Sequence, residues 1–281
     1  MSDRKFIKMH GLGNDFVVLD RRANGDAVTP ALARAVADRH TGIGCDQVIV
    51  IGRSETGLAD AELIFFNPDG GTSAACGNGT RCVASLLMGE TGAKHLVLET
   101  GHGLLDADCS SNGEICIDMG LVKTEWRDIP LGQAGDTLHL GIAEGALVDP
   151  VGVSIGNPHA VFFVEDAGAI DLERLGPKLE RHEMFPERAN IGVAEVRATD
   201  RLRLRVWERG AGITRACGSG ACAAAVAGSR RQLTDRKIEV ELDGGLLAIE
   251  WLENGHVLMT GPVATSFTGE FDEALLEASQ P

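Results

Sequence analysis

The feature that most constrains the fold of this chain is a long internal repeat. Phe66–Cys82 reads FNPDGGTSAACGNGTRC, and Trp207–Cys222 reads WERGAGITRACGSGAC. In both segments an aromatic residue stands ten positions before a Cys-Gly-x-Gly sequence, so Cys76 and Cys217 correspond at an offset of 141 residues. A single short match of this kind would be a weak signal, because Gly-rich turns are common.

Three further pairs of polar residues recur in the same order and at nearly the same offset. In a chain of 281 residues, so long a period excludes a solenoid of short repeats and indicates two fused copies of one domain. The pairs are Asn67 with Glu208 at an offset of 141, and Asn14 with Asn157 and Gln47 with Asn190 at an offset of 143.

The local pattern is similar in the two copies and predicts an α+β fold. Short apolar or alternating runs bounded by Gly, Asn and Asp predict five strands in each half. They are Val17–Leu19, Val48–Ile51, Leu63–Phe66, Leu96–Leu98 and Ile115–Ile117 in the first half, and Val161–Val164, Leu202–Val206, Ile238–Leu242, Leu246–Trp251 and Val257–Met259 in the second. Residues 122–150 match least well and are expected to carry the crossover between the halves. Helices are fewer, and are predicted over Pro30–Arg39, Gly79–Met88, Leu172–His182 and Gly220–Arg230.

The two matched cysteines lie where chemistry is possible. Each Cys-Gly-x-Gly sequence leads into a predicted helix, so Cys76 and Cys217 stand at helix N-termini, where N–H groups and the helix dipole favour negative charge. Such a position is expected to lower a cysteine pKa and can also hold a substrate carboxylate. One such motif alone also fits a buried structural cysteine. Two thiols on opposite sides of one carbon could remove a proton from one face and return one to the other.

Polar residues close the apolar face of the strand before each cysteine. Alternation places Leu202, Leu204 and Val206 on one face, and Glu208 at its end. Asn67 takes the same place in the first copy. Polar side chains at such positions tend to mark sites, because their burial is costly unless they are satisfied. The alternative for the second copy is an exposed ion pair of Glu208 with its neighbour in sequence.

Charge and cysteine usage exclude several classes of partner. The net charge is −15 and no run of Lys or Arg is present, which argues against nucleic acid or an anionic membrane as the partner. The sequence shows no signal peptide and no apolar stretch of roughly 18 residues, so a cytoplasmic protein is expected. The seven cysteines form no CxxC pair or zinc-like spacing, which argues against a disulfide scaffold and a metal site.

Five motifs together resemble those of the diaminopimelate epimerase family, and the resemblance covers essentially the whole chain. It implies a cofactor-independent isomerase that interconverts LL- and meso-diaminopimelate for lysine and cell-wall precursor synthesis. It also implies a homodimer. The motifs are Lys8–Phe16, Gly42–Gln47, Cys76–Gly79, Gly156–Val161 and Glu208–Gly220.

The same resemblance implies a domain arrangement. Two related domains are expected, each a β-barrel-like sheet around a central helix, with the active site in the cleft between them. We expect the first domain to comprise residues 1–120 with the C-terminal segment 264–281, and the second to comprise residues 121–263.

The resemblance also implies roles for individual residues. Cys76 and Cys217 are expected to be the acid/base thiols, with His159 and Glu208 supporting catalysis. No cofactor or metal is expected. The residues expected to bind the amino-acid substrate are Asn14, Gln47, Asn67, Gly77, Asn78, Asn157, Asn190, Glu208, Arg209, Gly218 and Ser219.

Three other functions remain open at this point. A racemase of the proline racemase type would share the paired thiols but act on a compact substrate. A hydrolase could combine Cys76 with His159 and Asn157, although it would give the second Cys-Gly-x-Gly sequence no role. A non-catalytic amino-acid-binding protein could keep the pocket. One departure from the family concerns the dimer, since Phe267 stands near the place of a tyrosine that some members have at their dimer contact.

Overall fold

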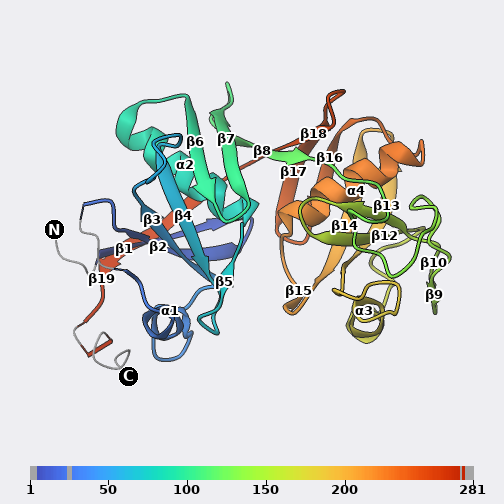
Figure 1. Ribbon diagram of the computed structural model, residues 1–281, viewed down its shortest axis with the longest axis horizontal. Helices are drawn as coiled ribbons and strands as arrows, with labels where there is room; N and C mark the ends of the chain where they lie inside the picture. The colour runs from blue at the N-terminus through green and yellow to red at the C-terminus, as the bar shows by residue number, and fades with distance from the viewer. Residues whose placement is uncertain (1–4, 24–26, 273, 276–281) are drawn as a thin grey trace. The chain divides into compact units, whose positions relative to one another are not determined.

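The computed structural model describes residues 5–23, 27–272 and 274–275. Their fold is α+β, as predicted, with 19 strands and four helices in this part of the chain. The chain divides into two compact units (Figure 1), the first formed by Met1–Ile117 and Gly261–Pro281 and the second by Asp118–Thr260. Residues 122–150 lie within the second unit and are not a crossover between halves. Their apolar side chains, Ile129, Leu131, Leu140, Ile142 and Leu147, belong to that unit's core.

The first unit has one mixed sheet in the order β19-β1-β2-β3-β4-β6-β7-β8, with the short β5 on β4. Only the β2–β3 and β4–β6 pairs are parallel. The helices are α1 (Pro30–Ala37) and α2 (Gly77–Thr91). The strands are β1 (Lys5–Gly11), β2 (Asn14–Asp20), β3 (Gln47–Gly52), β4 (Ala61–Phe66), β5 (Thr72–Ser73), β6 (His95–Thr100), β7 (Gly103–Cys109), β8 (Ile115–Leu121) and β19 (Ala264–Glu270).

The second unit repeats this topology in the order β11-β12-β13-β14-β16-β17-β18, with β15 on β14. Again two pairs are parallel, β12–β13 and β14–β16. Its helices are α3 (Leu172–Glu180) and α4 (Gly218–Arg230). The strands are β9 (Ala143–Glu144), β10 (Leu147–Val148), β11 (Val151–Ser154), β12 (Pro158–Val164), β13 (Asn190–Ala198), β14 (Arg201–Glu208), β15 (Gly212–Ile213), β16 (Lys237–Leu242), β17 (Gly245–Trp251) and β18 (His256–Gly261).

The strand register confirms the internal repeat. Phe16 pairs with Gln47 in the first unit, and His159 pairs with Asn190 in the second, each at the offset of 143 residues. A one-residue slip would turn every side chain of a strand to the opposite face, so matched register means matched side-chain directions. The first hairpin is the exception. Two residues separate Gly11 from its partner Asn14, whereas three separate Ser154 from Pro158.

Each unit folds its sheet around one helix that is buried on most sides. In the second unit, α4 contacts β11, β12, β13, β14, β16 and β17. Ten of its thirteen residues are buried, as expected for a helix enclosed by other elements. In the first unit, α2 contacts β1, β2, β6 and β7. Close approach at its start requires Gly79, since a Cβ there would lie 2.8 Å from Ile49 Cδ1 and 2.9 Å from Phe65 Cε1.

The observed helices begin or end at residues other than those predicted, and the difference changes the position of the two cysteines. The predicted helices at 79–88 and 220–230 begin two residues earlier, at Gly77 and Gly218. The cysteines are therefore the N-cap residues themselves. The first predicted helix ends at Ala37 because Asp38 is extended, with φ −61° and ψ 124°, and the predicted helix at 172–182 ends at Glu180.

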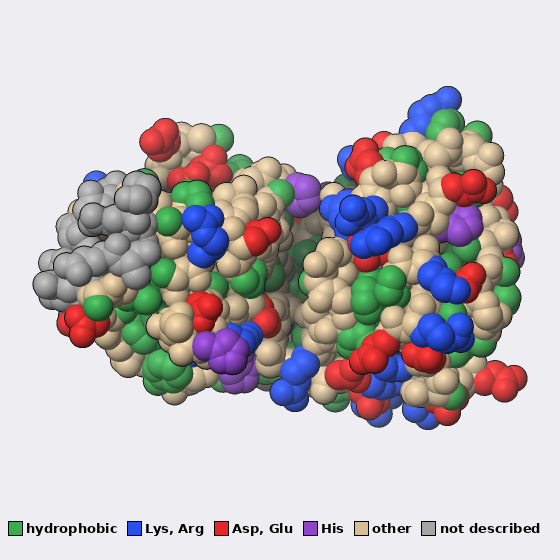
Figure 2. Space-filling model, turned by 90° about the horizontal axis from the view of Figure 1, so that it is seen from below, with side chains coloured by type: hydrophobic (Ala, Val, Ile, Leu, Met, Phe, Trp, Pro, Cys, Tyr) green, Lys and Arg blue, Asp and Glu red, His purple; other side chains and the backbone are tan. Residues whose placement is uncertain are grey.

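The surface carries side chains of both charges. On the face shown in Figure 2, Lys and Arg side chains lie among Asp and Glu side chains, and the described residues form no continuous basic area there. Within the described ranges, no helix has the length and apolar character needed to cross a membrane.

Candidate active site

The first unit brings Cys76 together with two of the predicted binding residues. Cys76 is half-buried and caps α2 with an extended backbone, φ −147° and ψ 108°. Its Sγ lies 3.9 Å from Oδ1 of Asn14, at the start of β2. The same oxygen accepts a hydrogen bond of 3.1 Å from Nδ2 of Asn78, a buried residue in the first turn of α2. Gly77, the first residue of that helix, is buried between them.

A second polar pair of the first unit lies at the ends of β3 and β4. Nε2 of Gln47 donates a hydrogen bond of 2.9 Å to Oδ1 of Asn67. Asn67 follows β4. Its carbonyl oxygen accepts a hydrogen bond of 2.9 Å from the N–H of Gly70, which closes the turn. Both side chains are half-buried. The matched strands thus place these two predicted binding residues next to each other.

The second unit surrounds Cys217 with donors from its own helix. Cys217 caps α4 and is only 4% exposed. Its Sγ accepts a hydrogen bond of 3.3 Å from the N–H of Gly220 and lies 3.7 Å from Oγ of Ser219. A Cβ on Gly220 would lie 3.1 Å from the sulfur, so a side chain here would require the neighbouring atoms to shift by a few tenths of an ångström. Gly218, between the cysteine and Ser219, is buried.

The surroundings of Cys217 shift the pKa of its thiol in the direction opposite to the predicted one. Burial and the nearby carboxylate of Glu208 raise the pKa of the Cys217 thiol well above its usual range, while Gly220 and Ser219 only partly oppose this. The expectation that the helix N-terminus lowers this pKa was wrong, because desolvation and the negative charge outweigh the helix N–H groups. Glu208 itself accepts a hydrogen bond from the hydroxyl of Thr214.

His159 is a buried, neutral residue that orients Asn157. It is 1% exposed, and burial together with the positive charge of Arg209 lowers the pKa of His159 to about 3. Its Nε2 lies 3.0 Å from Oδ1 of Asn157 and 3.5 Å from Nδ2 of Asn190. An amide oxygen can only accept, so the shorter contact requires the proton on Nε2. Nδ2 of Asn157 in turn donates to Oγ of Ser219 at 3.4 Å.

The start of β13 and the end of β14 connect the last predicted residues. Oδ1 of Asn190 accepts a hydrogen bond of 2.8 Å from the backbone N–H of Arg209. The exposed guanidinium of Arg209 donates to the carbonyl oxygen of Glu187 at 2.9 Å. Glu208 is half-buried beside Cys217, so the alternative of a merely exposed surface pair does not describe it.

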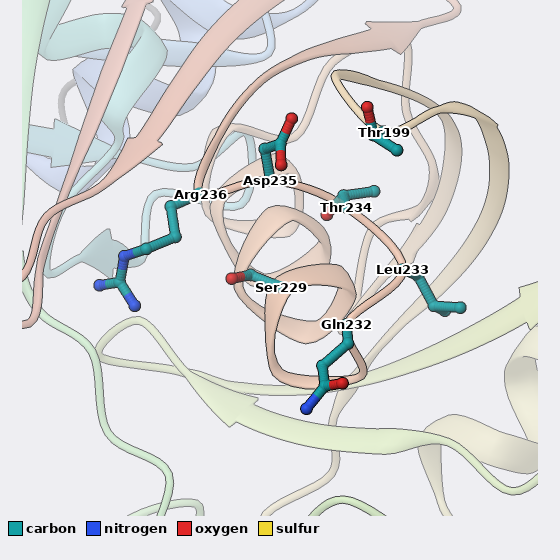
Figure 3. A pocket seen from close by; sticks show the side chains of 7 residues that line it. All are labelled: Thr199, Ser229, Gln232, Leu233, Thr234, Asp235 and Arg236. Carbon is teal, nitrogen blue, oxygen red and sulfur yellow. The ribbon is translucent and has the colours of Figure 1, made fainter.

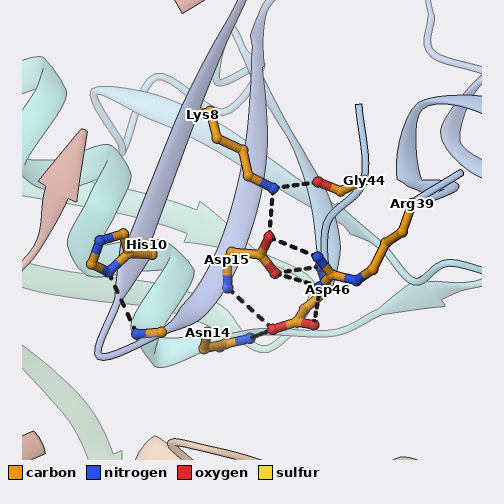
Figure 4. A network of polar contacts seen from close by, with 8 residues as sticks. Lys8, His10, Asn14, Asp15, Arg39, Gly44 and Asp46 are labelled. Carbon is orange, nitrogen blue, oxygen red and sulfur yellow. Dashed lines mark hydrogen bonds and ion pairs between the residues drawn. The ribbon is translucent and has the colours of Figure 1, made fainter. Parts of the chain in front are cut away.

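A charged network beside Asn14 was not predicted from the sequence. It is formed by Lys8, Asp15, Arg39 and Asp46 (Figure 4). Burial opposes ionisation of Asp15, but hydrogen bonds and charges of Arg39 and Lys8 outweigh it and lower the pKa of Asp15 to about 2. Asp46 accepts a hydrogen bond of 2.8 Å from Nδ2 of Asn14. The only sequence signal for the network was the position of these acidic residues inside two of the family motifs.

Figure 3 shows a surface pocket of the second unit, which lies at the end of α4 opposite to Cys217. It is lined by Thr199 and by residues that end or follow α4, among them Ser229, Gln232 and Thr234. Since α4 has thirteen residues and rises about 1.5 Å per residue, its two ends are roughly 20 Å apart. The convergent polar groups around the cysteine identify the better candidate site. Among the described residues, no group of His, Cys, Asp and Glu is suited to hold a metal ion.

Comparison with known proteins adds independent evidence. The family model for diaminopimelate epimerase matches residues 6–125 and 151–266. A diaminopimelate epimerase of Rhodospirillum centenum is 56% identical and covers 99% of this chain and 96% of its own length. One of Acidiphilium cryptum is 55% identical, with 97% and 98% covered.

Solved structures with lower sequence identity show the fold alone. A hydroxyproline epimerase of Agrobacterium vitis superposes with a TM-score of 0.67 at 16% identity, covering 95% of this chain and 90% of that one. A predicted epimerase of Pseudomonas aeruginosa has a TM-score of 0.66 at 18% identity, with 95% and 99% covered.

Proposed function

Because this chain belongs to the diaminopimelate epimerase family, we propose that it interconverts LL- and meso-diaminopimelate. The reaction would serve lysine and peptidoglycan precursor synthesis. One observation carries the proposal beyond the family name. Cys76 and Cys217 are the N-cap residues of equivalent helices in two units that share one topology. Two equivalent thiols suit a reaction whose forward and reverse directions exchange the roles of acid and base.

In the proposed mechanism, one thiol acts as a thiolate and removes the α-proton, and the other donates a proton to the opposite face of the same carbon. The direction of the reaction decides which thiol begins ionised. The backbone N–H groups of Gly77 and Gly218, with the side chains of Asn78 and Ser219, would hold the α-carboxylate at the helix starts. They would thereby stabilise the negative charge that develops as the proton leaves.

The remaining polar residues suit a long substrate with an amino acid at each end. The exposed guanidinium of Arg209 is a candidate partner for the distal carboxylate. Glu208 and His159 would act beside the thiols, the first through its charge near Cys217 and the second by orienting Asn157. The further candidate contacts are the side-chain amides of Asn14, Gln47, Asn67 and Asn190.

We also propose that the enzyme needs no cofactor, works in the cytoplasm and forms a homodimer. Proton transfer between sulfur and carbon requires no electron sink if the helix starts stabilise the carbanion. The proposed dimer contact involves β19, where Phe267 is 50% exposed and packs edge-on against Phe6 with ring centroids 5.9 Å apart.

Exchange of the α-hydrogen tests the proposed reaction directly. Incubation of the protein with LL-diaminopimelate in deuterium oxide should place deuterium at the α-carbon and produce the meso isomer, as followed by NMR and chiral chromatography. Cys76→Ala and Cys217→Ala should each abolish epimerisation. Cys109→Ser, which removes a thiol on β7 outside the proposed site, should retain it.

The same assay separates the alternatives. Turnover of proline in place of diaminopimelate would support the racemase of the proline racemase type. An activity that survives Cys217→Ala would support the one-nucleophile hydrolase. Binding of diaminopimelate without any deuterium incorporation would support a non-catalytic binding protein.

A further inference from the structure

The charged network of the first unit holds one end of the Asn14 amide. Nδ2 of Asn14 donates to Oδ2 of Asp46 at 2.8 Å, and the backbone N–H of Asp15 donates to the same oxygen at 3.1 Å. Arg39 binds both acids, with Nη2 at 2.7 Å from Oδ1 of Asp46 and 2.7 Å from Oδ1 of Asp15. Lys8 binds Asp15 at 2.5 Å and also donates to the carbonyl oxygen of Gly44. Figure 4 shows these contacts converging on the carboxylates of Asp15 and Asp46.

This arrangement decides which atom of Asn14 faces Cys76. An ionised carboxylate can only accept hydrogen bonds, so the atom of the Asn14 amide that faces Asp46 must be the nitrogen. The oxygen must then point the other way, toward the start of α2. There it accepts from Asn78 at 3.1 Å and lies 3.9 Å from the Cys76 sulfur. The two ends of an amide are nearly equal in size, so charge and not shape selects this orientation.

The second unit holds its equivalent amide the other way round. Asn157 directs its nitrogen at Ser219 of α4, at 3.4 Å, and its oxygen at His159, at 3.0 Å. At the offset of 143 residues, the position of Asp46 corresponds to Ala189. The first unit therefore has an acidic residue that orients the amide, whereas the second unit has an alanine at the equivalent position.

We propose that Asp46 is a positioning residue, which holds the nitrogen end of Asn14 and so directs its oxygen at the Cys76 sulfur. The chemical consequence for the reaction rests on the proposed function. An acceptor beside a thiol favours the protonated form and makes the thiolate a stronger base, as a weakly acidic α-proton requires. The Asn14 oxygen thus does for Cys76 part of what the Glu208 carboxylate does for Cys217.

Other charged and titratable groups also lie near Cys76. Arg81 is fully buried on α2 and interacts electrostatically with Cys82, as Cys76 also does. Both groups are present in every variant, so the informative quantity is the difference between variants. The elements packed against α2 carry further charged and titratable groups, namely Lys5, Lys8 and His10 on β1, Asp15 and Asp20 on β2, His95 and Glu99 on β6, and Asp106 and Asp108 on β7.

The test is the pH dependence of Cys76 alkylation in Asp46→Asn. Asparagine has the same shape but offers both a donor and an acceptor, so the Asn14 amide can turn and present its N–H to the sulfur. Iodoacetamide labelling followed by mass spectrometry of the Cys76 peptide should show a midpoint lower by about half to one pH unit. The Cys217 midpoint should not move. The turnover number for diaminopimelate should fall about three- to tenfold.

Two variants keep the outcome interpretable. Arg39→Gln leaves the Asp46 carboxylate in place but removes its anchor, and should move the Cys76 midpoint in the same direction by less. Asp20→Asn removes another ion pair of β2, between Asp20 and Arg22 at 2.6 Å, and should move neither the midpoint nor the turnover number. If Asp46→Asn lowers the melting temperature, Arg39→Gln and the midpoint still decide the question.

An unchanged Cys76 midpoint in both Asp46→Asn and Arg39→Gln would overturn the positioning role. Faster alkylation at every pH, affecting Cys82 and Cys217 as well, would also overturn it, because it would indicate general loosening. Labelling needs no substrate. A wild-type protein that leaves diaminopimelate unchanged would refute the proposed function, while the shift in midpoint would still test the role of Asp46.

Discussion

At the scale of single residues, the two thiols occupy the same place in the repeat but have different neighbours. Cys217 is buried beside the Glu208 carboxylate and accepts from the Gly220 N–H. Cys76 is half-buried and faces the side-chain amide of Asn14. The first copy has Asn67 where the second has Glu208. This difference places a negative charge beside Cys217. If both thiols act on one substrate, as proposed, they do so in different electrostatic surroundings.

Replacing Glu208 by glutamine should lower the pKa of Cys217, because the negative charge disappears while burial remains. The alkylation midpoint of Cys217 should therefore move to lower pH, and the midpoint of Cys76 should stay. We expect kcat/KM to fall at least about tenfold. Glu195→Gln removes another buried carboxylate of the second unit, on β13, and is the matched control. An identical Cys217 midpoint in wild type and Glu208→Gln would contradict this account.

The role of a residue could be predicted where the sequence signal lay in a local motif, and not where it depended on the packed structure. The repeat identified both cysteines and the polar partners Asn14 and Asn157 from sequence alone. The predicted direction of the Cys217 pKa shift was wrong, because burial depends on how the whole unit packs and cannot be read from the motif. The contact of Asn14 with Asp46 joins residues 32 positions apart, and no periodicity records such a contact.

At the scale of helices and strands, the sequence predicted elements with a pattern and missed those without one. Strand β11 and the first six residues of β13 are buried throughout, so they lack the alternation by which a half-buried strand is recognised. Strand β19 is the opposite case, since six of its seven residues are exposed. Strands β1 and β7 were missed as well. The two central helices were found because each follows a Cys-Gly-x-Gly sequence.

The start of α2 should tolerate no side chain at Gly79. Alanine there would place Cβ 2.8 Å from Ile49 Cδ1 and 2.9 Å from Phe65 Cε1, and overpacking of this kind costs about 1–3 kcal/mol. Gly89 lies on the same helix, and a Cβ added there would meet no atom within 4 Å, so Gly89→Ala should raise stability by up to about 1 kcal/mol. Urea unfolding of both variants measures the difference. Equal effects of the two substitutions would show that packing at the helix start is not tight.

At the scale of the whole molecule, the exposed strand β19 is the expected dimer contact. A largely exposed strand is prone to associate with a second chain, and Phe267 adds a large apolar side chain that is 50% exposed. Sedimentation velocity should show a dimer for the wild type and a monomer for Phe267→Glu. Leu58→Glu alters a more exposed apolar side chain of the same unit, at 68%, and should remain a dimer. A wild type that is monomeric at all concentrations would refute the homodimer.

The internal repeat makes a second prediction about the whole molecule, because it supplies both thiols within one chain. If the proposed site is complete in each chain, Cys76→Ala and Cys217→Ala cannot complement each other. Co-expression with two different affinity tags, followed by tandem purification of the mixed dimer, should therefore yield no epimerase activity. The control mixed dimer, wild type with the Cys76→Ala, Cys217→Ala double variant, should retain about half of the wild-type activity per dimer, since one of two sites is intact. Activity in the first mixture would mean that thiols from different chains meet at one substrate, and the assignment of both catalytic thiols to a single chain would have to be abandoned.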